Sequence, residues 1–201
     1  MIKLVIILVV LTLLGAFFPD KPQAAARAET ATFAGGCFWG VEDTFRQLDG
    51  VVSTTSGFTG GHVDRPSYRQ VSTGDTGHVE AVRVTFDPKR ISYAELLDAF
   101  WSCHDPTRQR DGEEPHRSII FFHDEQQQLT AMASLKELSN STAFDGRAIA
   151  TQVRPAVEFF PADEEHQQYL AKLGRTTTCS VGERPITTRL ASNAREARQQ
   201  R

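Results

Sequence analysis

A strand pattern that runs through two glycines into a helical pattern is the feature that most constrains the fold. Residues 30–34 have the composition of a short strand, and apolar residues recur at helical spacing over 41–48. Between these segments lies the hexapeptide Gly35-Gly36-Cys37-Phe38-Trp39-Gly40. We therefore predict a sharp strand-to-helix turn that places Cys37 at the start of the helix.

A cysteine at the start of a helix has the surroundings of an activated nucleophile. The thiolate is the reactive form, and unpaired backbone N–H groups together with the helix dipole lower the pKa of a thiol. Phe38 and Trp39 follow directly and are candidates for the wall of an apolar pocket, although ordinary core aromatics would give the same pattern. The cluster predicts a reactive thiol beside an apolar surface.

The other patterns interleave strands and helices without a regular βαβ rhythm. We predict strands over 51–58, 82–86, 119–122 and 149–157, helices over 92–101, 126–138 and 162–173, and loops over 57–67 and 105–116. A capping box, Ser92 with Glu95, opens the first of these helices. The interleaving predicts an α+β fold built as a two-layer sandwich.

The first 28 residues differ from the rest of the chain. Lys3 precedes an apolar run over 4–18, which Pro19 and a small-residue region around 24–28 follow. This is the order of a secretory signal, and the shortness of the run favours cleavage over an uncleaved anchor in the inner membrane. We expect an exported protein of the periplasm or cell envelope, with anchoring through residues 4–18 as the alternative.

Composition and cysteine usage narrow the function classes. The apolar fraction of 40% is that of a globular protein, and the net charge of −3 without a basic stripe argues against nucleic-acid binding. An odd number of cysteines, Cys37, Cys103 and Cys179, argues against a simple disulfide framework in an oxidising compartment. Cys103 ends an apolar helix, and we expect a buried free thiol there. No Cys/His pairs have metal-ligand spacing, so we expect no metal.

The hexapeptide and the following Val41-Glu42 resemble the signature of the A-type peptide-methionine (S)-S-oxide reductases, the MsrA family. The similarity continues in register over roughly residues 30 to 180. It runs through Thr54-Thr55-Ser56-Gly57-Phe58-Thr59-Gly60-Gly61, Gly77-His78-Val79-Glu80, His104-Asp105-Pro106-Thr107, Arg117-Ser118 and the segment from Phe160 to Gln167. Several ordered motifs are far more specific than one short pattern.

The resemblance implies an enzyme that reduces methionine S-sulfoxide, in proteins and as the free amino acid, and so repairs oxidative damage. Cys37 matches the thiolate that attacks sulfur, and Glu80 matches the acid that protonates the sulfoxide oxygen. Phe38 and Trp39 match the pocket for the substrate methyl group. Cys179 matches the cysteine that attacks the resulting sulfenic acid, giving a disulfide that a thioredoxin-like dithiol reduces. No bound cofactor is implied, and we expect a monomer.

We accordingly expect a mixed sheet, a ferredoxin-like core with extra elements and an irregular C-terminal tail. Residues 1–28 form the signal peptide or anchor with its linker, 29–181 the catalytic domain and 182–201 a polar flexible tail. For an exported chain, the reductant must be a periplasmic or membrane-relayed thioredoxin-like protein.

Two positions depart from the family's pattern. We place Phe58, which has no hydroxyl, at the first of two tyrosines that hold the sulfoxide oxygen, and His116 at the second. The loop before His116 is shorter than usual, and Asp111 matches the acidic residue of that loop. Because an imidazole N–H is a donor, we hypothesise that His116 and Glu80 together contact the oxygen.

Three other interpretations stay open from the residues alone. Histidines at 78, 104, 116 and 166 offer partners for a cysteine hydrolase, and a thiol peroxidase has the same need for an activated cysteine. In a non-enzymatic binding domain anchored to a membrane, Cys37 would be structural. Without the family, Glu80 is better explained as a surface carboxylate on a strand.

Overall fold

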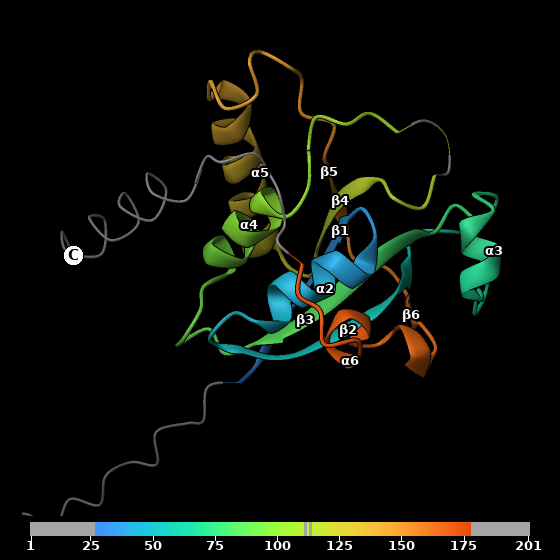
Figure 1. Cartoon of the computed structure of the whole chain (residues 1–201). Helices are drawn as coiled ribbons and strands as arrows, with labels where there is room; N and C mark the ends of the chain where they lie inside the picture. Colours follow the sequence, from blue (N-terminus) through green and yellow to red (C-terminus); the bar gives the residue numbers. More distant parts are fainter. Residues whose placement is uncertain (1–26, 111, 113, 178–201) are drawn as a thin grey trace, which may run out of the picture.

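A mixed β-sheet forms the centre of the computed structural model, which describes residues 27–110, 112 and 114–177 (Figure 1). Within these residues the sheet has six strands in the order β5-β4-β1-β3-β2-β6. The strands are β1 (Glu29–Gly35), β2 (Val51–Thr59), β3 (Val79–Phe86), β4 (Ser118–Phe122), β5 (Gln152–Pro155) and β6 (Phe159–Pro161). Only β4 and β5 pair in parallel, which confirms the prediction of a mixed sheet.

The four central strands and two helices have the ferredoxin-like connection predicted above. The chain runs β1, α2 (Phe38–Arg46), β2, β3, α4 (Tyr93–Ser102) and β4, and the central strand order is β4-β1-β3-β2. This is a split βαβ arrangement, in which each helix connects strands that have one antiparallel strand between them. The extra elements are α3 (Tyr68–Ser72), α5 (Glu125–Asn140), a 3₁₀-helix (Glu164–His166), α6 (Tyr169–Lys172) and the edge strands β5 and β6.

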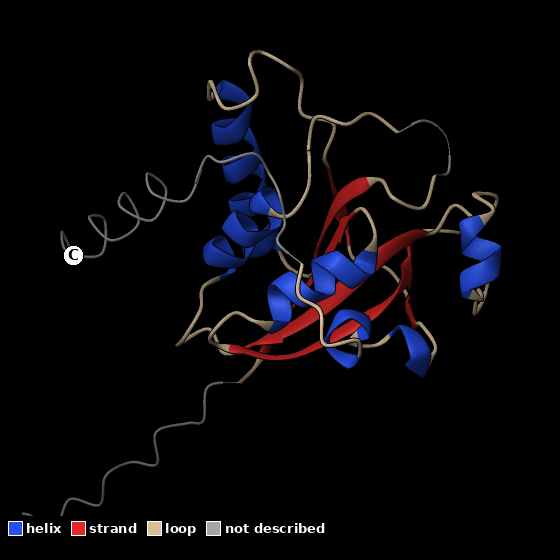
Figure 2. Cartoon of the chain, in the orientation of Figure 1, coloured by secondary structure: helices blue, strands red, loops and turns tan. Residues whose placement is uncertain are grey.

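The helices cover one face of the sheet, where the larger core lies (Figure 2). Alternate residues of the strands face opposite sides, so Phe33 enters this core while Ala34 belongs to a smaller cluster on the other face. Phe33 stacks on Phe45 of α2 at 4.9 Å and on Phe100 of α4 at 5.3 Å between ring centroids. These contacts fix both helices on β1, directly beside the turn that carries Cys37.

The predicted strand over 149–157 is shorter in the structure, where it is β5, and the unpredicted strand β6 follows it at the opposite edge of the sheet. β5 pairs with β4, whereas β6 pairs with β2 at the far edge, antiparallel to it. Periodicity indicates extended backbone but carries no information about which edge a strand joins. The predicted helix over 162–173 is also interrupted, because Gln168 adopts a left-handed conformation with φ of 49° between the 3₁₀-helix and α6.

Two features of the helices did not follow from helical periodicity. The helix α3 was not predicted, although Ser67 and Gln70 form a complete capping box at its start. In α5, Leu129 and Met132 are 59% and 51% exposed, whereas Ala131 and Leu138 are buried. The helix presents a different face to the sheet than its largest apolar side chains indicate.

Several predictions fall outside the described residues. These are the signal or anchor segment over 1–26 with its apolar run at 4–18, Asp111, Cys179 and the tail over 182–201. Among the helices that the structure describes, none has the length and apolar character needed to cross a membrane.

Candidate active site

Cys37 lies at the turn between β1 and α2, as predicted. It is the N-cap residue of α2, and its carbonyl oxygen accepts hydrogen bonds from the N–H groups of Gly40 and Val41 at 3.2 and 3.4 Å. Gly36 has a φ of 101°, a backbone conformation that L side chains rarely adopt, so glycine is needed there for the turn itself. The side chain of Cys37 is exposed at the end of the helix.

The protonation of the thiol differs from the expectation. Although the side chain is exposed, neighbouring protein atoms remove part of the water around the sulfur; this desolvation raises the pKa of Cys37, and the charge of Glu80 raises it further. The N–H groups of Trp39 and Gly40 act in the predicted direction and lower this pKa, but their effect is the smaller one. The helix start alone therefore does not produce a resting thiolate, and the thiol shares its electrostatic environment with a carboxyl group.

Glu80 is the charged group beside the thiol. It lies on β3, is 2% exposed, and its Oε2 accepts a hydrogen bond of 2.9 Å from the backbone N–H of Phe38. That N–H is one of the unpaired groups at the start of α2, where a carboxyl oxygen is well placed. Burial at this position excludes the interpretation of Glu80 as a surface carboxylate.

His116 contacts the other oxygen of the same carboxyl group. The distance from His116 Nε2 to Glu80 Oε1 is 3.4 Å. The backbone N–H of Glu80 also donates to the carbonyl of Pro115 at 2.8 Å, which holds the loop before His116 against β3. The structure thus brings Cys37, Glu80 and His116 together from three separate segments.

Phe38 and Trp39 have different environments. The interpretation as an ordinary core aromatic fits Phe38, and the interpretation as part of an apolar surface fits Trp39. Phe38 is fully buried in the core, whereas Trp39 is only partly buried. Trp39 stacks face to face with Tyr169 of α6 at 3.9 Å and lies nearly parallel to Tyr68 at 6.2 Å. Its indole Nε1 is shielded from solvent and has no hydrogen-bond partner among the described residues.

Tyr68 is a site residue that the sequence reasoning missed. Burial raises the pKa of its phenol, and the charges of Glu80 and Cys37 raise it as well, so the hydroxyl lies within electrostatic reach of both groups. Phe58, in contrast, is 1% exposed and packs behind Phe38 with 5.7 Å between ring centroids. Phe58 therefore belongs to the core, and Tyr68 is the residue of this pair that lies within electrostatic reach of Glu80 and Cys37. The capping box that opens α3 was the signal in the sequence that indicated an ordered element there.

A sequence model of peptide methionine sulfoxide reductases matches residues 29–199 of this chain. The chain belongs to this family. The match extends beyond residue 181, where we expected the catalytic domain to end. The chain is therefore an oxidoreductase of a family that reduces methionine sulfoxide.

The relatives are similar over most of their length. The peptide methionine sulfoxide reductase MsrA of Methanosarcina acetivorans is 52% identical over 150 residues, which are 73% of this chain and 79% of that protein. MsrA of Methanothermobacter thermautotrophicus is also 52% identical, over 151 residues, which are 73% of this chain and 89% of the relative. MsrA of Acidobacterium capsulatum is 47% identical over 75% of this chain and 98% of its own.

Solved structures confirm the α+β fold. Reduced Mxr1 from Saccharomyces cerevisiae has a TM-score of 0.69 at 31% identity and covers 77% of this chain and 91% of its own. Methionine sulfoxide reductase A of Corynebacterium diphtheriae has a TM-score of 0.67 at 34% identity, covering 82% and 80%. Mxr1 in complex with Trx2 has a TM-score of 0.52 at 27% identity, covering 72% of this chain and 86% of its own.

A groove of about 380 Å³ opens beside Tyr68 in this reductase. Its volume is within the range of small-molecule sites, and its lining mixes apolar rings with charged side chains. The lining residues are Phe58, Arg65, Pro66, Ser67, Tyr68, Phe160, Pro161, Ala162 and Asp163.

Cys103 and the remaining histidines of the reductase have structural contacts. Cys103 is only partly buried, in contrast to the expected buried thiol, and its sulfur donates to the carbonyl of Phe100 at 3.2 Å. Burial lowers the pKa of His104 to about 4, and His104 Nε2 is 2.7 Å from Ser118 Oγ. His78 is hydrogen-bonded to the backbone of Gly61 and Val63. Since Glu80 is the charged group that acts on Cys37, the arrangement does not favour a cysteine–histidine hydrolase.

The described residues contain no group of three or more His, Cys, Asp or Glu side chains that could hold a metal ion.

Proposed function

We propose that the chain reduces methionine S-sulfoxide, in proteins and as the free amino acid, with Cys37 as nucleophile and Glu80 as acid. The observation that carries this proposal is the buried Glu80 carboxyl group, which contacts the Phe38 N–H and acts electrostatically on the Cys37 thiol. An acid and a nucleophile at one site are what attack on a sulfoxide needs, because its sulfur is electrophilic and its oxygen is basic.

In the first step, the sulfur of Cys37 attacks the sulfoxide sulfur. A sulfur–sulfur bond forms in this attack; the protonated oxygen then passes to the Cys37 sulfur as the sulfur–oxygen and sulfur–sulfur bonds break, so that methionine leaves and Cys37 becomes a sulfenic acid. The methionine sulfur is reduced by two electrons while the cysteine sulfur is oxidised by two. A protonated Glu80 gives its proton to the oxygen. While Glu80 still holds that proton it carries no charge, so one of the effects that hold Cys37 in the thiol form is absent before the attack.

Two neighbouring donors support the sulfoxide oxygen. His116 Nε2 faces Glu80 Oε1, so its N–H can orient the acid and contact the oxygen. The hydroxyl of Tyr68 is a second donor, since it lies within reach of the charges of Glu80 and Cys37. Asp111 is retained as a candidate for the same oxygen-binding loop on the strength of the family resemblance.

The ring of Trp39, supported by Phe38 beneath it, is the surface for the substrate methyl group. Tyr68 and Tyr169 lie parallel to the indole and restrict its orientation. A rigid apolar wall opposite an oxygen-binding group fixes which faces of the sulfur carry methyl and oxygen. Such a site selects one epimer, and we assign the S epimer because the family resemblance implies it.

In the second step, Cys179 attacks the Cys37 sulfenic acid and a disulfide forms with loss of water. A thioredoxin-like dithiol then reduces the disulfide, a step for which the complex of the similar Mxr1 with Trx2 is the support. The apolar segment over 4–18 supports export, so this partner would be periplasmic or relayed through the membrane. We propose a monomeric enzyme that repairs proteins in the cell envelope.

Single turnover without a reductant tests this mechanism. The reduced protein is mixed with either epimer of methionine sulfoxide, and the methionine formed and the cysteine linkages are measured by mass spectrometry. We expect one equivalent of methionine from the S epimer, a Cys37–Cys179 disulfide, and no product from the Cys37→Ser variant. Product from that variant would refute the nucleophile, and a Cys37–Cys103 linkage would refute the assignment of Cys179.

A further inference from the structure

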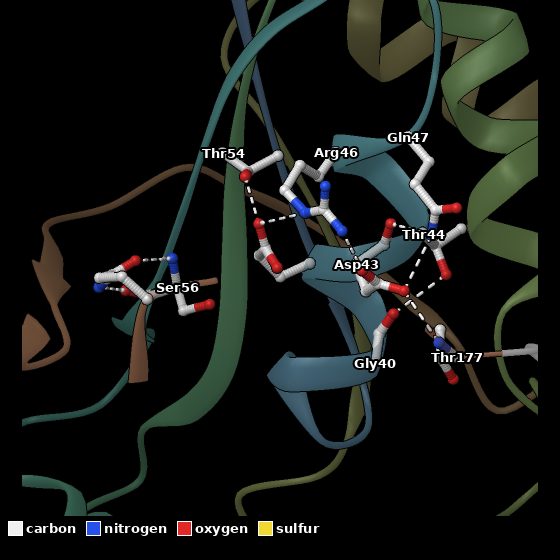
Figure 3. A network of polar contacts seen from close by, with 10 residues as sticks. Gly40, Asp43, Thr44, Arg46, Gln47, Thr54, Ser56 and Thr177 are labelled. Atoms are coloured by element: carbon white, nitrogen blue, oxygen red, sulfur yellow. Dashed lines mark hydrogen bonds and ion pairs between the residues drawn. The ribbon is translucent and has the colours of Figure 1, made fainter. Parts of the chain in front are cut away.

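Asp43 is a fully buried carboxylate in α2, 0% exposed, six residues after Cys37. A buried charge is stable only when donors surround it. Two donors come from the same helix: the Arg46 guanidinium contacts Oδ1, and Gln47 Nε2 donates to Oδ2 at 2.8 Å (Figure 3). The adjacent Glu42 points the other way and accepts from Thr54 on β2 at 2.6 Å.

The third donor to Asp43 comes from the far end of the described chain. The backbone N–H of Thr177 donates to Asp43 Oδ2 at 2.9 Å, across a separation of 134 residues (Figure 3). The Thr177 hydroxyl lies over Gly40, since its oxygen would be 3.6 Å from a Cβ built there. Thr177 is therefore held against the first two turns of α2.

The chain that leads to Thr177 is attached to the same helix at an earlier point. Tyr169 of α6 stacks on Trp39, and the N–H of Arg175 donates to the carbonyl of Leu170 at 2.9 Å just after α6 ends. The chain from α6 to Thr177 thus has two contacts with α2: the aromatic stack of Tyr169 and the hydrogen bond from Thr177 to the Asp43 carboxylate. Hydrogen bonds to an ionised carboxylate are roughly twice as strong as neutral ones.

This attachment restricts where the next residues can be. Gly40 is in the first turn of α2, and its N–H is bonded to the carbonyl of Cys37. Cys179 follows Thr177 by two residues in the sequence, and consecutive Cα atoms are about 3.8 Å apart, so the covalent link between the two positions spans at most about 7.6 Å. A disulfide needs a Cα–Cα distance of about 5.5 to 6 Å.

We propose that Asp43 is a positioning residue for disulfide formation, holding the chain at Thr177 so that Cys179 meets the oxidised Cys37. This inference rests on the proposed function, in which Cys179 resolves the sulfenic acid. In that step the Cys179 sulfur displaces the hydroxyl from Cys37, a sulfur–sulfur bond forms, and the thiol proton leaves with the hydroxyl as water. Asp43 touches none of the reacting atoms.

The physical basis is effective concentration. Without the contact at Thr177, the chain after α6 is held only through the stack of Tyr169 on Trp39, and the arrangement in which the Cys179 thiol meets the Cys37 sulfenic acid competes with more alternatives. In our proposal, an anchor two residues before Cys179 reduces these alternatives and so raises the local concentration of that thiol near Cys37. Loss of one charge-assisted bond at the anchor should slow disulfide formation by about ten-fold or more.

Two variants remove the contact from opposite sides. In Asp43→Asn, one carboxylate oxygen is replaced by an NH₂ group. Because Arg46 and Thr177 donate to different oxygens of Asp43, one of these two donors would then face the NH₂ group. Thr177→Pro removes the N–H and leaves α2 unaltered. Thr177→Ala is the matched control, because it keeps the N–H and removes only the hydroxyl over Gly40.

The test separates the two chemical steps in the reduced protein, using methionine S-sulfoxide. We expect methionine formation in single turnover to stay within about two-fold of the parent protein, since Asp43 is not at the reacting atoms. Disulfide formation, followed by the lifetime of the trapped sulfenic acid, should slow by about ten-fold or more in Asp43→Asn and Thr177→Pro but not in Thr177→Ala.

Turnover with thioredoxin should fall in parallel, whereas dithiothreitol, which reduces the sulfenic acid directly, should support the parent rate. Should Asp43→Asn fail to fold, Thr177→Pro decides the matter. Disulfide formation at the parent rate in Thr177→Pro would overturn the role of Asp43. Failure of the parent protein to form methionine or a Cys37–Cys179 disulfide would instead refute the proposed function.

Discussion

Glu80 Oε1 lies 3.4 Å from His116 Nε2, while the other oxygen of the same carboxyl group accepts the N–H of Phe38. The acid is therefore held between the start of α2 and the loop that precedes β4. His116 is about one-third exposed and Glu80 is buried, so the imidazole closes the solvent side of the carboxyl group. This relationship makes the role of His116 testable.

Replacement of His116 should separate its contribution as a donor from its contribution to packing. His116→Phe removes the N–H, and we expect kcat/KM for methionine S-sulfoxide to fall by about 10- to 100-fold. His116→Tyr places a hydroxyl donor at the same position and should retain most of the activity. Steady-state kinetics measures both variants, and an unchanged kcat/KM in His116→Phe would contradict a direct role.

Tyr68 and Phe58 offer a matched pair for the second donor. We expect Tyr68→Phe to lower kcat/KM by about ten-fold or more, because it deletes the hydroxyl near Glu80 and leaves the ring stack on Trp39. Phe58→Tyr in the same background should not restore activity, since position 58 is buried behind Phe38. Rescue by Phe58→Tyr would show that position 58 faces the substrate.

The burial of Phe58 also has a consequence for stability. A hydroxyl added there enters a packed apolar core, which should lower the free energy of unfolding by about 1–3 kcal/mol. Urea denaturation of Phe58→Tyr alone measures this change, and stability equal to that of the parent would be inconsistent with the packing of Phe58 on Phe38.

The reactivity of Cys37 should depend on pH in a direction set by Glu80. Burial and Glu80 both raise the thiol pKa, so alkylation by iodoacetamide should accelerate as pH rises, since only the thiolate reacts. Glu80→Gln removes the charge, which lowers the pKa of Cys37. We expect several-fold faster alkylation of this variant near neutral pH. Slower alkylation would mean that Glu80 does not oppose ionisation of the thiol.

His104 should make the fold sensitive to acid. Its pKa is lowered from 6.5 to about 4 in the folded protein, so between these values the unfolded chain binds the proton and the folded chain does not. The contribution to stability is therefore complete above pH 6.5 and is lost as pH falls toward 4, by up to about 3 kcal/mol. Denaturant unfolding across this range measures the loss, and His104→Gln should make it shallower. An equally steep decline in that variant would assign the effect to other groups.

Local patterns predicted much of the fold because they depend on neighbours in the chain. The two glycines before Cys37 predicted the turn, Ser92 with Glu95 predicted the start of α4, and alternation over 82–86 predicted a buried strand. Leu129 and Met132 show the limit, because apolar character alone did not determine which face of α5 meets the core.

In the candidate site, too, some features were predicted from the sequence and others were not. Cys37 and Glu80 were identified from the sequence through the family's motifs, and the position of Cys37 at the helix start followed from local chemistry. The sequence did not show that Tyr68 lies near Glu80 and Cys37 while Phe58 is core, nor that the net effect on the Cys37 pKa is upward. Both depend on which side chains from other elements surround the group.

What the sequence by itself determined is the strand–glycine–cysteine–helix turn, the family and its reaction class, because these follow from residues adjacent along the chain or from ordered motifs. Only the tertiary structure decided that Glu80 and His116 meet, that β5 and β6 join opposite edges, and that Thr177 is bound to Asp43. These contacts join segments that are distant in sequence. Because buried polar groups need hydrogen-bond partners, each one pairs with whichever group the tertiary structure brings next to it.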